Sequence, residues 1–398
     1  MRSSAVWAAL VSLLAVTEAW QPASTQKTDK LAAQGMRNLY ASERRHHGHK
    51  GCNIKNAAVR KEWLTLTPHE KKDYISAVKC LQSKPALSSA TVPGAKTRYD
   101  DFVGVHIQQT LTGNFLSWHR YFTWAYETAL REECGYKGYQ PYVNWGKHAL
   151  DIQGSPLFDG SSTSMSGNGA YRPHNATGIP SNDAPLILLA PGVGGGCVAS
   201  GPFKNLTVNL GPLAPSLRDS VPTATGLEYN PRCLRRDLTQ AAASLGSTDA
   251  TSYELISNHT TVLDFQNTMQ GNGFLNNYIG VHTAGHFWVL PPSPNPVRNP
   301  PLTPSQVNGD PGGDFFASPG DPFFFLHHGQ IDRTWQIWQN LDLKNRQNAI
   351  SGTRTIGNMP PSPNATLSDV LDLGVLAPNI TLGEAMSTLG GPFCYIYA

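Results

Sequence analysis

Two pairs of histidines stand at spacings that suit a metal site. His282 and His286 are four residues apart, so on a helix they project from one face, and Gly285 keeps the side chain beside them small. His327 and His328 are adjacent and follow an aromatic run. A buried neutral imidazole needs a partner for its acceptor nitrogen, and that partner is either a hydrogen-bond donor or a metal ion.

Two further histidines lie in apolar helical patterns. His119 is inside the aromatic segment 115–124, and His106 belongs to a pattern that begins at Asp100. One such histidine is most often an ordinary hydrogen-bonded core residue. Several of them on separate apolar helices favour a shared metal site instead.

Apolar periodicity predicts the helices that position these histidines. Positions 115, 118, 122, 125 and 129 repeat at the helical period within 114–133. Ile331, Trp335 and Trp338 repeat in the same way after Pro322, which is well placed to open a helix, with Asp321 as its cap.

The rest of the chain predicts more helices and long loops. Helices are expected over 59–63 and 71–81, the latter preceded by a capping box from Thr67 to Glu70, and again within 234–270. The stretch 155–235 is rich in Gly, Pro, Ser and Asn, and it is typical of surface loops with short elements. His174 in this stretch is expected to face solvent.

Composition sets the broad class of protein. With 398 residues, 40% hydrophobic and 15% charged, the chain can bury a large core, and its net charge of +3 without a charge run gives no sign of nucleic-acid binding. Residues 1–19 resemble a secretory signal peptide whose apolar run is too short to span a bilayer, and no other segment is apolar enough to do so.

Cysteine and asparagine usage agrees with secretion. Six cysteines fit an oxidising compartment and up to three disulfides, whose pairing the sequence leaves open. Asn175, Asn205, Asn258, Asn364 and Asn379 each begin an Asn-x-Ser/Thr sequon, which suggests a glycoprotein. Residues 20–45 are polar without a clear period and are expected to form a flexible lead-in or pro-segment. The histidines of 44–50 are expected in a basic loop rather than in a metal site.

The motifs FLSWHRYF at 115–122, HTAGH at 282–286 and DPFFFLHHGQIDRTW at 321–335 resemble, in this order, the tyrosinase family of type-3 copper proteins. The resemblance is closest to short secreted fungal members. It implies a mainly α-helical domain over 46–398, a four-helix bundle around a dicopper centre with long loops and few short strands. It also implies two copper ions, for which neutral imidazole is a suitable ligand in both oxidation states.

The same resemblance implies roles for individual residues. Copper B would be held by His282, His286 and His328, with His327 beside the site, and copper A would include His106 and His119. Asp332 and Arg333 would make structural polar contacts nearby.

Residues after the first two copper B ligands bear on the substrate in this family. Thr283 and Phe287 directly follow those ligands, and Phe315 or Phe316 would cover the site as a gate; ordinary core packing is the alternative for these residues. Thr283 is not the Asn that is often associated with monophenol activity, which favours o-diphenols. The implied reaction is oxidation of o-diphenols to o-quinones by dioxygen, with monophenols or o-aminophenols as further substrates.

The sequence departs from the family at copper A. The family has a histidine nine positions before the Trp-His-Arg histidine, and here that position holds Thr110 in a shortened loop. Either a gene-model boundary is misplaced, or the deletion is real and copper A is weak, replaced or absent. His148 could in principle substitute. A copper-impaired protein and a dioxygen-binding, haemocyanin-like protein therefore remain as alternatives to the enzyme. The implied partners are a phenol and dioxygen, and the oligomeric state stays open.

Overall fold

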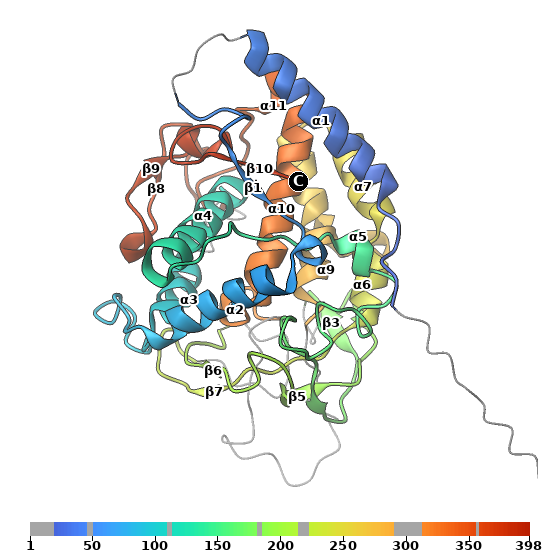
Figure 1. Cartoon of the computed structure of the whole chain (residues 1–398), viewed down its shortest axis with the longest axis vertical. Coiled ribbons are helices and arrows are strands. Elements are labelled where there is room, and N and C mark those ends of the chain that lie inside the picture. The colour runs from blue at the N-terminus through green and yellow to red at the C-terminus, as the bar shows by residue number, and fades with distance from the viewer. Residues whose placement is uncertain are drawn as a thin grey trace, which may run out of the picture.

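The computed structural model describes residues 20–45, 51–109, 114–180, 185–213, 223–289, 313–355 and 358–398. The expected signal peptide at 1–19, the three histidines of the basic loop at 44–50 and Thr110 lie outside these described residues. Helices dominate, and the mainly α-helical prediction is confirmed (Figure 1). The α-helices are α1 Gln26–Arg45, α2 Pro68–Ser83, α3 Arg98–Gln109, α4 Phe115–Cys134, α5 Trp145–His148, α6 Gln240–Gly246, α7 Asp249–Asn258, α8 Val262–Met269, α9 Val281–His286, α10 Phe323–Leu341 and α11 Leu343–Arg346.

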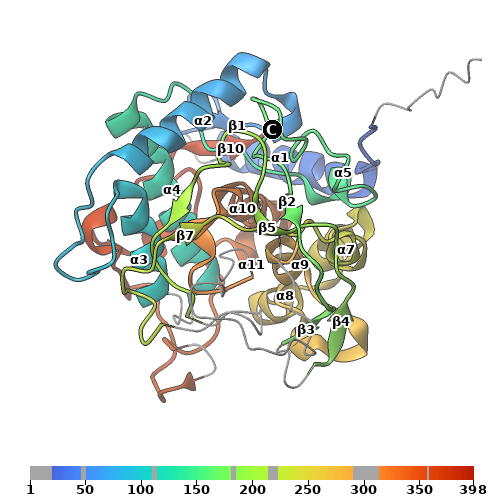
Figure 2. The same cartoon turned by 90° about the horizontal axis from the view of Figure 1, so that it is seen from below.

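Strands are short and pair only two by two within the described ranges. β1 runs parallel to β10, and the pairs β2–β5, β3–β4, β6–β7 and β8–β9 are antiparallel. In Figure 1, β3, β5, β6 and β7 lie toward the bottom of the molecule, and in Figure 2, seen from below, β2, β5 and β7 lie in front of the helices. The strands are β1 Ala58–Arg60, β2 Gly169–Tyr171, β3 Thr177–Ile179, β4 Ile187–Leu189, β5 Gly195–Val198, β6 Thr207–Val208, β7 Arg232–Cys233, β8 Val370–Leu371, β9 Ile380–Thr381 and β10 Tyr395–Tyr397.

Helix α10 is the core of the molecule. Every residue from Phe323 to Asn340 is buried, because α1, α4, α7 and α9 all pack against it. The helix begins one residue later than predicted, with Pro322 rather than Asp321 at the cap position, and the Asp321 carboxylate accepts the Phe323 N–H at 2.9 Å. Arg236 binds both carboxylate oxygens of Asp321, at 2.6 and 2.7 Å, which fixes this turn.

The predicted helix α4 carries His119 against α10. Its apolar stripe is buried, and Gly135 ends the helix in a left-handed conformation (φ 71°) that glycine adopts without strain. The capping box predicted at the start of α2 is confirmed by the reciprocal bonds of Thr67 and Glu70. The predicted helix at 59–63 is wrong, since Ala58–Arg60 forms β1, which pairs with the C-terminal strand.

The prediction of a flexible segment at 20–45 is wrong for residues 26–45, which form α1 along α10 (Figure 1). Thr28, Gly35 and Leu39 are the buried positions of α1, and two of the three are small or polar. An added Cβ at Gly35 would lie 3.0 Å from the Asn340 Cβ, so small residues let the two helices approach closely. Leu31 and Ala32 also pack against the core, so the inner face carries apolar residues at helical spacing within a segment that is mostly polar.

Three disulfides link distant parts of the chain, and one of them holds the segment before the last strand. The six cysteines form three disulfides, as the sequence allowed, between Cys52 and Cys394, Cys80 and Cys134, and Cys197 and Cys233. The first of them lies beside the β1–β10 pair.

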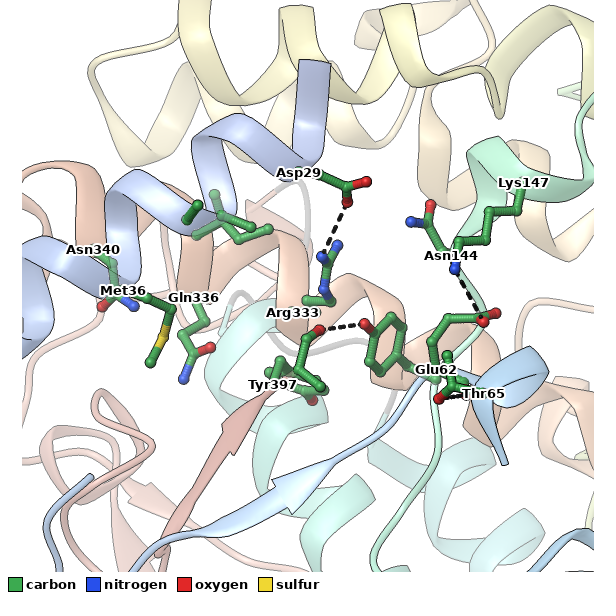
Figure 3. A pocket seen from close by; sticks show the side chains of 15 residues that line it. Asp29, Met36, Glu62, Thr65, Asn144, Lys147, Arg333, Gln336, Asn340 and Tyr397 are labelled. Carbon is green, nitrogen blue, oxygen red and sulfur yellow. Dashed lines mark hydrogen bonds and ion pairs between the residues drawn. The ribbon is translucent and has the colours of Figure 1, made fainter. Parts of the chain in front are cut away.

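A cleft lies between α1, α10 and the residues Tyr397 and Ala398. It contains Arg333, which points toward Asp29 of α1 at 3.7 Å (Figure 3).

Two surface features bear on the compartment. Each of the five sequon asparagines is exposed. Among the helices of the described ranges, not one combines the length and the apolar character that a membrane crossing requires.

Candidate metal centre

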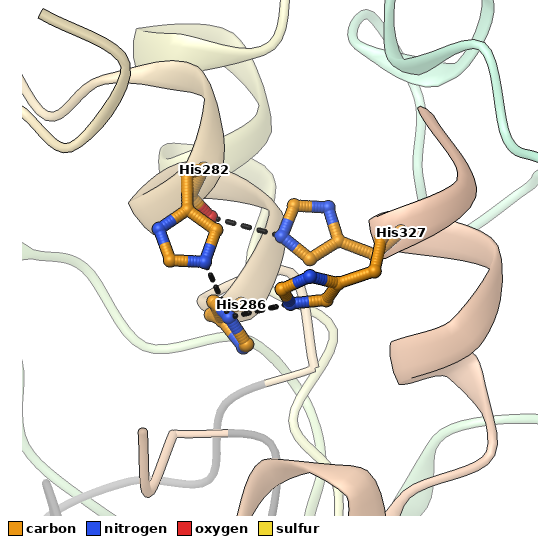
Figure 4. A group of neighbouring side chains, drawn as sticks. His282, His286 and His327 are labelled. Carbon is orange, nitrogen blue, oxygen red and sulfur yellow. Dashed lines mark hydrogen bonds between the residues drawn. The ribbon is translucent and has the colours of Figure 1, made fainter. Parts of the chain in front are cut away.

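Four buried histidines meet between α9 and α10. The ligand atoms of His282, His286, His327 and His328 all lie within 4.8 Å of one another. Figure 4 shows the rings of α9 and α10 turned toward each other. The Nε2 atom of His286 lies 2.9 Å from that of His282 and 3.3 Å from that of His328. Three ring nitrogens are thus directed at one point.

His327 lies close to the other three histidines, but its ring nitrogens are already hydrogen-bonded. Its Nδ1 accepts the indole N–H of Trp145 at 3.0 Å, and its Nε2–H donates to the backbone oxygen of His282 at 3.0 Å. Both ring nitrogens are therefore occupied, and neither has a lone pair for a metal. Periodicity could not separate the adjacent histidines, whereas these two bonds leave His328 as the possible ligand.

Gln270 holds the first histidine of α9. Its side-chain oxygen accepts the Nδ1–H of His282 at 2.5 Å, which leaves the Nε2 lone pair of His282 facing the group. Its backbone oxygen accepts the Thr283 hydroxyl at 3.0 Å. Metal-binding histidines usually donate their other N–H in this manner, because the bond fixes the tautomer and the ring orientation.

A second pair of histidines, from α3 and α4, has the same chemistry. His106 donates Nδ1–H to the Phe316 oxygen at 2.7 Å, and His119 donates Nδ1–H to the Phe115 oxygen at 2.9 Å. A carbonyl oxygen can only accept, so both neutral rings have their lone pair on Nε2. These two Nε2 atoms face each other at 3.3 Å. Two lone pairs in this position repel unless a cation lies between them.

The His106–His119 pair lies next to the four-histidine group of α9 and α10. The rings of His119 and His328 stack with centroids 4.5 Å apart, and the Phe115 ring lies 4.5 Å from His119 and 4.7 Å from His282. Phe324 stacks on His328 at 3.9 Å. Imidazoles from four separate helices thus converge within one aromatic shell, as a site for two neighbouring metal ions requires.

Burial keeps these imidazoles neutral. Desolvation lowers the pKa of His106 to about 4 and that of His327 to about 3. Desolvation also holds the pKa of the other four, His119, His282, His286 and His328, well below the usual value. Neutral imidazole is the form that binds metals, so the donor set fits copper.

The other residues singled out in the sequence divide into those near the centre and those that support it. The Phe315 ring lies 5.5 Å from His286 and 5.8 Å from Phe287, and Thr283 is buried against Gln270. Phe316 contributes its backbone oxygen to His106.

The remaining predicted residues lie away from the histidines. Asp332 binds Arg120 at 2.6 Å and the hydroxyls of Tyr395 and Tyr397 at 2.6 and 2.7 Å. In the Trp-His-Arg motif, His119 thus faces His106 and Arg120 faces Asp332 of α10. The solvent-facing prediction for His174 is wrong, since its side chain is 2% exposed and binds Asp237 at 3.1 Å.

His148 does not join the centre. Its Nδ1 lies 2.6 Å from the Ser155 hydroxyl, and its ring contacts Trp20 and Trp288. None of its described contacts is with His106 or His119. The possible substitution of His148 at copper A is therefore wrong.

Sequence reasoning missed two residues that orient the histidines. Gln270 directly follows the last residue of α8, and Trp145 begins the four-residue helix α5. No spacing to a histidine marks either of them.

Replacing Gln270 with Leu should weaken metal binding to α9 by about 10–100-fold, the usual effect of removing a partner of a ligating histidine. Gln270→Glu should retain binding, because a carboxylate also accepts the His282 Nδ1–H. Competition between the protein and a copper chelator measures the affinity. Equal affinity of the Leu variant and the parent protein would contradict the role of Gln270.

Replacing Gly285 with Ala should destabilise the fold by about 1–3 kcal/mol, the usual cost of overpacking a core. The added Cβ would lie 2.0 Å from Cε1 of His327, so the ring must move and its bond to Trp145 would be disturbed. Gly273→Ala has no atom within 4 Å of the new Cβ and serves as an uncrowded comparison, although its φ of 73° adds backbone strain of its own. Denaturant unfolding measures both, and a Gly285→Ala loss no larger than that of Gly273→Ala would refute the crowding.

Comparison with known proteins agrees with this geometry. The family model "Common central domain of tyrosinase" matches residues 96–341. The chain is 39% identical to "Tyrosinase P" of Aspergillus terreus over 354 residues, 85% of this chain and 91% of that protein. It is 39% identical over 367 residues to the N-acetyl-6-hydroxytryptophan oxidase of Emericella nidulans, 87% of this chain and 93% of that protein.

A solved structure shows the same fold. A mutant polyphenol oxidase from Thermothelomyces thermophila superposes with a TM-score of 0.82 at 40% identity, covering 94% of this chain and 98% of that one. The sequence relatives, the family model and the structural match all lead to one assignment. The chain belongs to the tyrosinase family of copper oxidases.

Proposed function

We propose that this protein oxidises o-diphenols to o-quinones with dioxygen. His282, His286 and His328 would hold copper B, and His106 and His119 would contribute to copper A. The observation that carries the proposal is the convergence of five neutral imidazoles, each with its Nε2 atom 2.9–3.3 Å from that of a neighbour in the same half. The ring of His328 also stacks on that of His119, which joins the two halves.

The reaction balances without any further reactant. Two o-diphenols lose four electrons and four protons, and one dioxygen takes them up to give two waters. Copper, when bound, would supply the electron exchange between the phenol and dioxygen. The chain's own residues hold the ligands neutral and oriented, and Phe115 and Phe324 keep water away from the imidazoles.

Residues around α9 support a preference for o-diphenols. The Thr283 hydroxyl donates a hydrogen bond to the backbone oxygen of Gln270. Thr283 therefore offers neither an amide nor a free hydrogen-bond donor beside His282. Phe315, partly buried against His286 and Phe287, is placed to cover the site. We propose that these two residues set which phenols enter and react.

Oxygen uptake by the copper-loaded protein tests the function. The substrates should be 4-methylcatechol, its monophenol p-cresol, o-aminophenol and a 6-hydroxyindole, the last because one relative is named for oxidation of N-acetyl-6-hydroxytryptophan. We expect quinone formation with the catechol and slower or no uptake with p-cresol. Reversible dioxygen binding without quinone would support a carrier instead, and copper binding without either would refute the enzyme.

We also propose that the protein is secreted as a glycoprotein. The three disulfides require an oxidising compartment, and the five exposed sequons are accessible to glycosylation. Mass spectrometry of the secreted chain, before and after removal of N-glycans, would test the sequons and the expected cleavage after residue 19.

A further inference from the structure

The two halves of the metal centre are unequal. α9 and α10 bring three histidines with converging Nε2 atoms, whereas α3 and α4 bring two. Between Ile107 and Trp118 the sequence contains no His, Cys, Met, Asp or Glu, so the short connection between α3 and α4 has no strong copper ligand to add. The difference is a property of the sequence itself, independent of how that connection folds.

The described surroundings of the pair do not replace the missing ligand. The rings nearest to His106 and His119 include Trp118, Phe122 and Phe324, with centroids 4.8–6.5 Å from them. The two Phe rings have no lone pair for a metal, and the Trp118 indole N–H is a hydrogen-bond donor only. The nearest other imidazole, His328, directs its Nε2 toward His286. Among the described residues, the pair therefore has two imidazoles and an apolar shell.

Copper responds to such a ligand set according to its oxidation state. Divalent copper prefers four nitrogen and oxygen ligands in a tetragonal arrangement. Monovalent copper accepts two ligands and carries less charge into an apolar shell, where an uncompensated charge costs most. A two-imidazole site walled by aromatic rings thus stabilises the monovalent ion over the divalent one.

We propose that the His106–His119 half retains copper only in the monovalent state, while the His282–His286–His328 half retains it in both. The inference rests on the proposed function only in taking copper as the resident metal. In the oxidised protein the second half then holds an isolated divalent ion. An isolated divalent copper has an unpaired electron that electron paramagnetic resonance detects, whereas a coupled pair is silent.

Copper counting and resonance spectroscopy test the asymmetry. The chain should be loaded with monovalent copper without oxygen, then oxidised and passed through a chelating column. We expect about two coppers per chain before oxidation and about one afterwards, with all of the remaining copper visible by resonance. Two coppers retained after oxidation with a silent spectrum would overturn the proposal.

Two variants assign the signal to its half. His119→Gln should lower the capacity for monovalent copper by one ion and leave the copper content and spectrum of the oxidised protein unchanged. His328→Gln should remove the spectrum of the retained divalent ion. A changed oxidised spectrum in His119→Gln would contradict the proposal, because it would show that this half holds divalent copper.

The outcomes separate this inference from the proposed function. One visible copper without quinone formation would refute the function and leave the asymmetry. Two silent coppers with turnover would refute the asymmetry and leave the function. A chain that binds no copper would refute both.

Discussion

His328→Gln is expected to lose the copper held by α9 and α10, together with oxygen uptake on catechols. The His328 Nε2 completes the group formed with His282 and His286, and two remaining imidazoles hold divalent copper poorly. The side chain is buried, so a glutamine of similar length is chosen to limit the cavity. The divalent copper retained by the oxidised protein and the oxygen uptake should fall to background while thermal unfolding stays cooperative.

The adjacent residue provides the matched control. His327→Asn should keep the copper, because both His327 nitrogens are committed to Trp145 and to the His282 backbone. It should lower stability by about 1–3 kcal/mol, since a buried donor is left without its acceptor. Loss of copper in His327→Asn with retention in His328→Gln would reverse the ligand assignment.

Asp332→Ala is expected to destabilise the protein by about 3–5 kcal/mol, the usual cost of breaking a buried ion pair by removing one partner. Arg120 would keep its positive charge inside the core without its carboxylate, and the hydroxyls of Tyr395 and Tyr397 would lose their acceptor. Denaturant unfolding gives the difference. The expected change is large because Asp332 and Arg120 are fully buried.

An ion pair between α1 and α10 whose carboxylate is half exposed serves as the comparison. Asp29 is half exposed and lies 3.7 Å from Arg333, so Asp29→Ala should cost at most about 1 kcal/mol. Similar losses for Asp29→Ala and Asp332→Ala would show that burial does not set the strength of these pairs.

The contribution of Asp332 to the free energy of unfolding should decrease in acid. Burial alone would raise the pKa of Asp332, but the charges of Arg120 and Arg60 and the two tyrosine hydroxyls outweigh it and hold the pKa below 3.8. A carboxylate with a lowered folded pKa stabilises the fold above its unfolded pKa of about 3.9, and this stability is lost as the pH falls through the folded value. The stability difference between the parent protein and Asp332→Asn should therefore be constant above about pH 5 and shrink in stronger acid.

Local patterns in the sequence were enough to predict the histidine-bearing helices. His119 and His328 lie on long, strongly periodic stretches, and such stretches become buried helices whatever packs on them. The choice between His327 and His328 was not available from periodicity, because it depends on the indole of Trp145, more than a hundred residues earlier in the chain. Gln270 was missed for the same reason: its contact with His282 depends on how α8 meets α9.

Helix α1 shows a different limit of sequence reasoning. Its inner residues Leu31, Ala32 and Leu39 do follow the helical period, but the segment is mostly polar, and the period alone does not show that the helix packs on α10. The backbone N–H groups of Lys27 and Thr28 are satisfied by Asp249, which no local pattern could indicate. Conversely, the strand at 58–60 replaced an expected helix because its partner lies at the other end of the chain.

The pairing of β1 with β10 has a consequence for biosynthesis. Asp332, in the middle of the central helix, receives hydrogen bonds from Tyr395 and Tyr397, and Cys394 is joined to Cys52. These partners are translated last, so a nascent chain on the ribosome still lacks two hydrogen-bond donors to the buried Asp332 carboxylate and the cysteine that pairs with Cys52. The contacts that join β1, β10 and the central helix can therefore form only after residue 397 has been translated.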